Sequence, residues 1–425
     1  MEKQLESGKR NSLDMAKSCL ERTRVFLEKY RYRAAGTHEC QQAAHEIAEI
    51  FRNSCDSIQE EVFKLNPRAL WYLGKAIAAI YLTGTIFAVL GGYFLYLGTF
   101  LCLLGLSYGI SQYVFYGRLF DPLFKRADGC NVVGLLEPKD VVNQQVILVG
   151  HHDSPYIFNF LERFQPVAFL RFFLGMAYYV WLCTLSVLLS VQQLLSNEFQ
   201  AASGVPLWIT ASGLLFVLQL FFMMSKNPSP GAGDNINSTS MIAEIAKFFK
   251  DERNGGSPLR NTRLIVLSTD GEEIGQRGAI EYMEKHYSEL HATSSYVFNI
   301  DSVYYYKDFK ILTRDRNFTC KLSNAMVSNI CEVAVEKGLH LKRMPIPFGG
   351  GGTDAAAFAA AGIEAASIIA QPTAFFSNDH LYHTSKDVVE KIDTSAVKAT
   401  IELAVGYIRK VDSTVFLKKD NNEEP

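Results

Sequence analysis

The chain has 425 residues, 48% of them hydrophobic, and carries a formal net charge of −2 at pH 7. This apolar content and the mean hydropathy of +0.04 are high for a soluble protein, so part of the apolar sequence is expected outside an ordinary core. The balanced charge excludes the basic excess of a nucleic-acid-binding protein and the acidic run of a solvating tail.

The amino-terminal part predicts two helices followed by a strand. Residues 1–22 are polar and lack the apolar core of a secretory signal, so no cleaved export segment is expected. Residues 12–56 carry helical apolar spacing interrupted by RYRAAGT, and residues 60–67 resemble a short strand. The eight cysteines of the chain form no C-x-x-C pair, which argues against a zinc ribbon and favours free thiols in a reducing compartment.

A long uncharged stretch follows, and it predicts a membrane hairpin. From Ala76 to Gly117 there is no charged residue, and this length far exceeds one helical crossing of a hydrocarbon core of about 30 Å. We therefore expect two crossings, near 73–93 and 96–116, with a bend close to Gly91.

A second hairpin is expected over 169–191 and 205–224, joined by a polar turn. The turns of both hairpins lack Lys and Arg, whereas the other ends of the spans are flanked by Arg68, Lys75, Arg118, Lys125, Arg126, Arg163, Arg171 and Lys226. Because basic residues concentrate on the cytoplasmic side, the sequence predicts a multi-pass integral protein of the cell membrane whose hydrophilic part is cytoplasmic.

Strand-like and helical segments alternate in the rest of the chain. Strands are expected at 131–138 and 144–150, and after the second hairpin the order is helix, strand, helix, strand, strand, helix, strand and helix, over 240–251, 263–269, 276–288, 296–301, 309–313, 320–337, 365–370 and 394–411. This alternation predicts an α/β fold with a mostly parallel central sheet and helices on both faces, to which four transmembrane α-helices are added.

The expected hairpins divide one hydrophilic domain into three parts. The domain is predicted to consist of residues 1–70, 118–164 and 226–415, with the hairpins at 71–117 and 165–225. Residues 416–425 are expected to form a disordered tail.

Residues of the metal-ligand type follow several of the predicted strands. They come from five separate segments and are His151, Asp153, Asp234, Glu272, Glu273, Asp301 and His383. Open α/β sheets form their ligand crevice at the carboxyl ends of the strands, so these side chains are expected to converge. Two histidines with several carboxylates suit a catalytic zinc site. Each residue alone is weak evidence, because strand-end acids often only cap helices.

The ordered motifs G-H-x-D, G-D-N, G-E-E, N-I-D and Y-H-T resemble those of the co-catalytic zinc aminopeptidase family, which also contains glutaminyl cyclase and the transferrin-receptor ectodomain. The segments RYRAAGTHECQQAAHEIAEIF and GTDAAAFAAAGIEAASI resemble the opening and a late segment of the same family. The resemblance implies the zinc aminopeptidase fold and extends over most of the hydrophilic sequence.

The resemblance also implies a role for each motif residue. Asp234 would bridge two zinc ions, with His151 and Asp301 completing one site and Glu273 and His383 completing the other. Asp153 would hold the ring of His151, and Glu272 would be the general base that takes a proton from the attacking water. Catalytic roles are thus expected for Glu272 and Asp153, and zinc binding for the other five.

Three positions depart from the family's pattern. Gly233 stands where the family often has a second acid, and Asn237-Ser238 stands where Ser-Gly is usual. Asp354 is followed by Ala355 instead of His, which leaves the substrate preference open. The run from Gly349 to Gly352 is interpreted as a flexible connector and is assigned no role.

The sequence therefore predicts a membrane-bound zinc metallopeptidase, acting as an aminopeptidase on peptide substrates, with the lipid bilayer and no nucleic acid as further partners. Because the second hairpin lies between Asp153 and Asp234, the active site is expected near the lipid headgroups. Either the substrate is itself membrane-associated or acylated, or the hairpins only localise an ordinary aminopeptidase. The alternatives are a glutaminyl-cyclase-like acyltransferase with one zinc and a non-catalytic membrane scaffold. The oligomeric state does not follow from the sequence.

Overall fold

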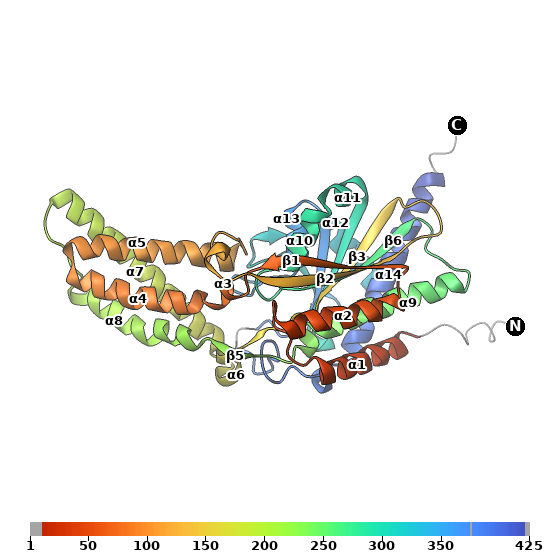
Figure 1. Ribbon diagram of the computed structural model, residues 1–425, viewed down its shortest axis with the longest axis horizontal. Coiled ribbons are helices and arrows are strands. Elements are labelled where there is room, and N and C mark those ends of the chain that lie inside the picture. Colours follow the sequence, from red (N-terminus) through yellow and green to blue (C-terminus); the bar gives the residue numbers. More distant parts are fainter. Residues whose placement is uncertain (1–10, 375, 421–425) are drawn as a thin grey trace.

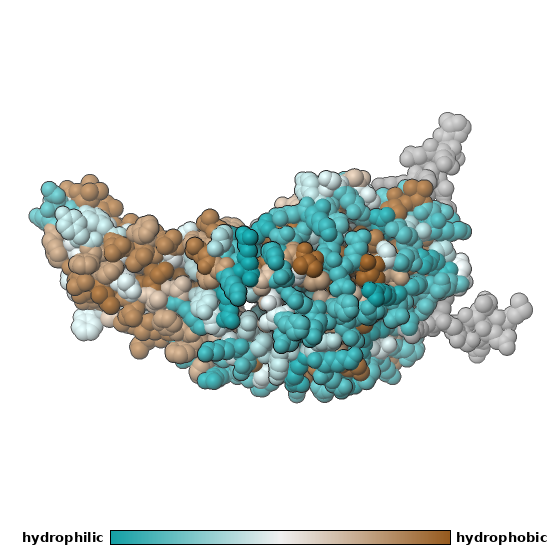
Figure 2. Space-filling view, viewed as in Figure 1, coloured by the Kyte–Doolittle hydropathy of each residue, from teal (hydrophilic) through white to brown (hydrophobic). Residues whose placement is uncertain are grey.

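The computed structural model describes residues 11–374 and 376–420 and consists of an α/β domain from which a bundle of apolar helices projects (Figure 1). The first and last described helices begin and end on the side of the domain away from the bundle. Hydrophobic residues dominate the surface of the bundle, and hydrophilic residues dominate the surface of the domain (Figure 2).

The central sheet has its parallel strands in the middle. The strand order is β1-β2-β6-β3-β7-β11-β8-β10, and β9 pairs with β8. The strands β6, β3, β7 and β11 pair in parallel. The strands β1 and β2 pair antiparallel with each other, β2 pairs antiparallel with β6, and β8 pairs antiparallel with β11 and parallel with β10. The bounds are Ser57–Leu65 for β1, Ala127–Leu136 for β2, Gln144–His151 for β3, Thr262–Thr269 for β6, Ser294–Val303 for β7, Phe309–Asp315 for β8, Cys320–Lys321 for β9, Lys342–Pro345 for β10 and Glu364–Ala370 for β11. The predicted α/β fold with a mostly parallel sheet at its centre is confirmed.

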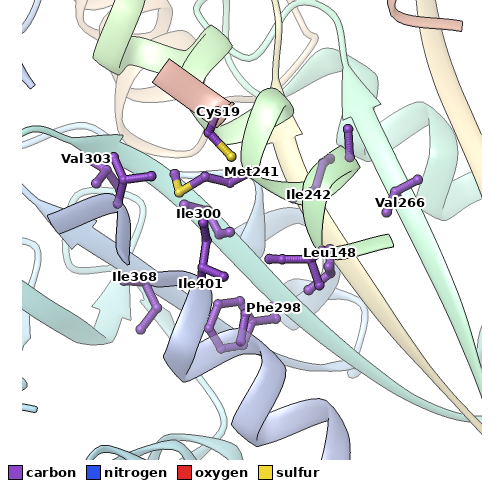
Figure 3. Packing of buried hydrophobic residues seen from close by; sticks show 14 of the residues in the cluster. Cys19, Leu148, Met241, Ile242, Val266, Phe298, Ile300, Val303, Ile368 and Ile401 are labelled. Carbon is purple, nitrogen blue, oxygen red and sulfur yellow. The ribbon is translucent and has the colours of Figure 1, made fainter. Parts of the chain in front are cut away.

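Helices cover both faces of the sheet, because the buried strands place alternate side chains on opposite faces. One face packs against α1 (Ser12–Lys29), α2 (His38–Arg52), α9 (Asn237–Asn254), α12 (Asn324–Glu336) and α14 (Thr394–Asp420). In this core, Leu148 and Phe298 of the strands lie close to Met241 of α9 and Ile401 of α14 (Figure 3). The other face packs against α10 (Arg277–Lys285), α11 (Tyr287–Ala292) and α13 (Ala355–Ala360).

Four helical segments are long and apolar enough to cross a membrane: Arg68–Leu90, Gly92–Val114, Ala168–Ser196 and Gly204–Phe222. They comprise the helices α3 (Arg68–Trp71), α4 (Leu73–Leu90), α5 (Gly92–Gly109), α7 (Ala168–Ser196) and α8 (Gly204–Val217) with short helical extensions. The first hairpin turns at Gly91 and Gly92, which both have positive φ, so the first helix ends and the second begins a few residues earlier than the sequence predicts. In the second hairpin, α7 continues through part of the expected polar turn and ends at Ser196, and the next residue, Asn197, is left-handed.

The two hairpins pack against each other, with contacts between α4 and α8, between α5 and α7, and at the tips. The hydroxyl of Tyr81 on α4 donates to the carbonyl of Thr210 on α8 at 2.8 Å, and that of Tyr179 on α7 donates to the carbonyl of Cys102 on α5 at 2.9 Å. At the tips, the Gly92 amide donates to the carbonyl of Gln200. The bundle thus has an apolar core of its own.

Short elements that the sequence does not predict fasten the second hairpin to the domain. The strand β4 (Tyr156–Phe158) precedes it, β5 (Met224–Pro228) follows it, and the two pair antiparallel. A short helix, α6 (Asn159–Phe164), leads from β4 into α7. At the other end of the chain, α14 continues to Asp420, into the segment expected to be a disordered tail, and residues 421–425 lie outside the described part.

Candidate metal centre

The predicted ligand residues converge at the carboxyl ends of the parallel strands. His151 ends β3, Asp301 lies near the end of β7, and Glu272 and Glu273 lie in the turn after β6. Asp234 lies in the turn before α9, and His383 lies in a loop before α14. All seven predicted residues are therefore within one cluster, although they come from segments as far apart along the chain as His151 and His383.

The cluster contains two sets of potential ligands that share Asp234. His151 Nε2 lies 3.3 Å from Asp234 Oδ1 and 3.9 Å from Asp301 Oδ2. His383 Nε2 lies 3.4 Å from Asp234 Oδ2 and 3.0 Å from Glu273 Oε2. Each oxygen of Asp234 thus faces a different histidine, which is the arrangement of a carboxylate between two cation sites.

These donor atoms fit zinc. A tetrahedral zinc ion with bonds of about 2.0–2.1 Å holds its ligand atoms roughly 3.3 Å apart, close to the separations observed here. Buried ligand-type atoms without a hydrogen-bond partner include the Nε2 atoms of His151 and His383, Asp234 Oδ2 and the Oε1 atoms of Glu272 and Glu273. Buried polar atoms are rarely left unpaired, so their convergence indicates that a cation belongs between them.

The electrostatics of the cluster point the same way. Burial raises the pKa of Glu273 to about 8 and that of Asp301 to about 7, and it also raises the pKa of Glu272 well above its usual range. The neighbouring negative charge of Asp234 adds to the effect on Glu273 and Asp301. Such a group of buried acids is costly without a compensating positive charge, and a divalent cation supplies that charge.

Asp153 connects the first ligand to the turn that carries both glutamates. Its carboxylate lies 3.4 Å from His151 Nδ1 and accepts hydrogen bonds from the backbone amides of Glu272 and Glu273, each at 3.2 Å. It is fully buried. Asp153 therefore both orients the imidazole and fixes where the two glutamates lie.

Sequence reasoning missed Asp387, which supports the bridging residue. Its carboxylate accepts hydrogen bonds from the amides of Gly233 at 2.7 Å and Asp234 at 3.2 Å, and from the Tyr304 hydroxyl at 3.0 Å. Burial, together with the charge of Asp234, raises the pKa of Asp387 to about 7. Its position four residues after His383 gives no signal of this role in the sequence.

The same ring of Tyr304 explains the glycine at position 233. A Cβ atom at Gly233 would lie 2.2 Å from Cε1 of Tyr304, so no other side chain fits there. The structure thus accounts for the absence of a second acid before Asp234.

Arg33 is a second residue that the motifs did not identify. Its fully buried guanidinium donates to the carbonyls of His152, Pro230 and Gly231, at 2.8, 3.0 and 3.1 Å. It therefore joins the end of β3, which carries His151, to the loop that leads to Asp234. Burial lowers its pKa to about 10.

The glycine run from Gly349 to Gly352, to which the sequence assigns no role, lies beside the cluster of predicted ligands. It lines a cavity that also reaches Glu272, Glu273 and His383. A Cβ atom at Gly351 would lie 3.6 Å from the Tyr116 hydroxyl and 3.8 Å from that of Tyr382, whose ring stacks on His383. The run is therefore part of the wall beside the turn that carries Glu272 and Glu273.

Comparison with known proteins agrees with this geometry. Residues 222–408 match the family model of peptidase family M28. No curated protein matches the sequence significantly.

Solved structures with a similar fold include zinc enzymes and a cyclase. A glutaminyl cyclase from an Acidobacteriales bacterium is 13% identical, with 96% of this chain and 98% of that chain covered and a TM-score of 0.55. BSAP, a zinc aminopeptidase from Bacillus subtilis, is 15% identical, with 93% and 94% covered and a TM-score of 0.54. A Zn-dependent exopeptidase from Parabacteroides distasonis is 13% identical, with 92% and 97% covered and a TM-score of 0.52.

The match to a peptidase family supports a hydrolase, and the structural likeness shows the fold. The predicted resemblance to the zinc aminopeptidase family is thereby confirmed, through peptidase family M28 over residues 222–408 and through the fold of the chain as a whole.

Proposed function

We propose that this chain is a membrane-bound, zinc-dependent aminopeptidase that uses two zinc ions to release amino-terminal residues from peptides. The observation that carries the proposal is the position of Asp234, whose two oxygens face His151 and His383 separately. Asp301 would complete the first zinc site and Glu273 the second. We further propose that the hairpins span the cell membrane and that the catalytic domain is cytoplasmic.

The proposed roles of the remaining residues follow from their contacts. When bound, zinc polarises the scissile carbonyl and lowers the pKa of the attacking water. Glu272 lies at the cluster, with one carboxylate oxygen 4.0 Å from His151 Nε2 and the other without a partner. It would accept the proton of the attacking water and deliver it to the leaving amine. Asp153 would keep both glutamates and His151 in place through the contacts described above.

The test combines metal content with activity. Protein purified in detergent is analysed for zinc per chain and for hydrolysis of short aminoacyl peptides, as wild type and as Glu272→Gln. We expect two zinc ions in both proteins and a loss of kcat/KM in the variant of about 10²–10⁴-fold, because only the proton transfer is removed.

A ligand variant provides the matched control. Glu273→Gln changes the adjacent residue by the same chemical step, and it should lose zinc as well as activity. One zinc per chain in the wild type, with cyclisation of an amino-terminal Gln instead of its release, would establish the glutaminyl-cyclase reaction in place of this proposal.

A further inference from the structure

One cavity joins the metal centre to the membrane hairpins. Its volume is about 540 Å³, and its wall includes Glu272, Glu273 and His383 at one end. The same wall continues along the bundle, where it is formed by residues of both hairpins such as Ile77, Gly105, Leu106, Gly109, Phe172 and Met176. We call it the hairpin cavity.

The hairpin cavity is apolar away from the metal centre. Glu272 and Glu273 are the only acidic residues in its lining within the described chain, and that lining includes neither Lys nor Arg. Two of its tyrosines already use their hydroxyls, since Tyr113 donates to the carbonyl of Gly349 and Tyr179 to that of Cys102. The wall on the bundle side therefore offers mainly carbon atoms to an occupant.

The part of the cavity between α5 and α7 is bounded at each end by a contact between the two hairpins. On the side nearer the hairpin tips, Tyr179 bonds to Cys102, and a Cβ atom at Gly105 would lie 2.1 Å from its hydroxyl. On the side of the α/β domain, the rings of Tyr113 and Phe172 lie 5.6 Å apart. Gly109 lies between these contacts, one turn from Gly105 on the same face of α5, and a Cβ atom there would have no atom within 4 Å.

The polarity of the cavity selects one kind of occupant. The ends of an α-helix carry backbone N–H and C=O groups without an intrahelical partner, and carbon walls cannot satisfy them. An extended peptide would bring backbone N–H and C=O groups against carbon walls, where each unpaired group is costly. A single hydrocarbon chain fits the volume and needs no polar partner.

We propose that the substrate is an amide carrying one long hydrocarbon chain, which lies in the hairpin cavity while the amide lies at Glu272. This inference rests on the proposed hydrolase and names its substrate class. Water adds to the amide carbonyl carbon and the C–N bond breaks. The carboxylate product keeps the oxygen of the water, and the amine takes up the proton that Glu272 has accepted. The chain is attached either to the carbonyl or to the nitrogen of the amide.

Two substrate series test the proposal and distinguish these attachments. One consists of N-acetyl-, N-octanoyl- and N-palmitoyl-alanine, the other of alanine ethylamide, octylamide and hexadecylamide, all at one detergent concentration with the zinc-loaded full chain. In the series whose chain is attached as in the substrate, kcat/KM should rise at least about 10-fold from the shortest to the octyl compound, because each buried methylene favours binding.

Two substitutions in α5 test whether the chain-length preference arises in the hairpin cavity. Gly109→Phe places a ring in the open space of the cavity and should lower the preference for long over short chains at least about 10-fold. Leu104→Phe adds a ring on the same helix at a residue that is 42% exposed and lies outside the cavity lining, and it should keep the wild-type preference. Zinc content verifies that both variants retain the metal centre.

A binding measurement separates the two possible failures. Native mass spectrometry of Glu272→Gln with N-palmitoyl-alanine and with alanine hexadecylamide should show binding that Gly109→Phe weakens. Binding of this kind without hydrolysis of any compound by the wild type would support the cavity assignment and remove the proposed function. Hydrolysis at a rate independent of chain length, or equal binding with and without Gly109→Phe, would overturn the substrate class and leave the hydrolase standing.

Discussion

Asp387 fixes the backbone that carries Asp234, the proposed bridging carboxylate. It accepts hydrogen bonds from Gly233 and Asp234 and is itself held by Tyr304. Substitution of residues that orient metal ligands typically costs about 10–100-fold in metal affinity or activity.

We therefore expect Asp387→Asn to weaken zinc binding about 10–100-fold, because an amide cannot accept all three hydrogen bonds. Competition with a chelator measures the affinity. Tyr304→Phe is the control, since it removes one of the three bonds and keeps the ring that packs on Gly233, and it should have a smaller effect. An Asp387→Asn protein with unchanged zinc affinity would refute this role.

A pH-dependent contact lies far from the metal centre, at the edge strand β1. His286 lies 2.8 Å from Glu61, and Lys285 donates to the same carboxylate oxygen at 2.7 Å. The hydrogen bond to Glu61 raises the pKa of His286. Its stabilising contribution is therefore complete below the unfolded-state pKa of about 6.5 and is lost as the pH rises through the higher folded-state pKa.

Thermal unfolding in detergent at a series of pH values above about 6.5 should show this loss as a falling Tm. His286→Gln keeps a hydrogen-bond donor but does not titrate, so its Tm should fall less over the same range. Parallel curves for the two proteins would show that the pair contributes nothing to the pH dependence.

At the residue scale, the motifs of the sequence identified the residues that cluster at the strand ends but not the residues that support them. His151, Asp234 and Glu273 occur in short, ordered patterns that resemble those of the zinc aminopeptidases. Arg33 acts on the same centre from a loop near the amino terminus, and its hydrogen bonds go to backbone carbonyls, whose positions no sequence pattern reveals.

At the scale of elements, close packing of α5 on α7 depends on glycine. Gly105→Leu would place side-chain atoms where the Tyr179 hydroxyl lies, since even a Cβ atom would be 2.1 Å from it. We expect the variant to lose about 1–3 kcal/mol of stability through overpacking, measured as a lower Tm in detergent. Gly109→Leu, one turn away in open space, should leave the Tm unchanged or raise it, because glycine is a poor helix former. Equal effects of the two changes would contradict the observed packing.

The elements that the sequence predicted are segments long enough to show a clear apolar pattern. The buried strands β3, β6, β7 and β11 are continuous apolar runs, and their observed bounds differ from the prediction by at most two residues. The elements β4, β5, β10 and α13 were not predicted, because segments of three to six residues are too short to show a period. The pairing of β4 with β5 depends on the second hairpin that separates them.

At the scale of the whole molecule, basic side chains gather where the bundle meets the domain. Lys75 lies 3.4 Å from the ring of Trp71, and Arg171 lies 3.9 Å from that of Phe164. Such pairs are typical of the interface between hydrocarbon and water. The distribution predicts that this side of the membrane is the cytoplasmic one.

Reporter fusions test the orientation. A reporter that is active only in the cytoplasm should be active when fused at Pro425, and one active only outside the cell should be silent there. The same reporters inserted in the turn between α7 and α8 should give the opposite pattern. Activity of the external reporter at Pro425 would reverse the proposed orientation.

The hairpin cavity is the whole-molecule feature that the sequence could not predict. Its walls come from both hairpins, the turn that carries Glu272 and Glu273, and the glycine run, so it exists only through the packing of the bundle against the domain. The hairpins themselves follow from composition, whereas the space enclosed between them depends on the side chains that meet, such as Tyr113 and Phe172.

The position of the second hairpin within the chain has a consequence for biosynthesis. The strand that carries His151 is synthesised before the hairpin, and the segment that carries Asp234 emerges after it. Because β4 and β5 pair only when both ends of the hairpin return to the same side, the cluster of ligand-type residues is completed only after the whole second hairpin has been made. A chain whose synthesis stops within the hairpin would therefore carry no assembled cluster.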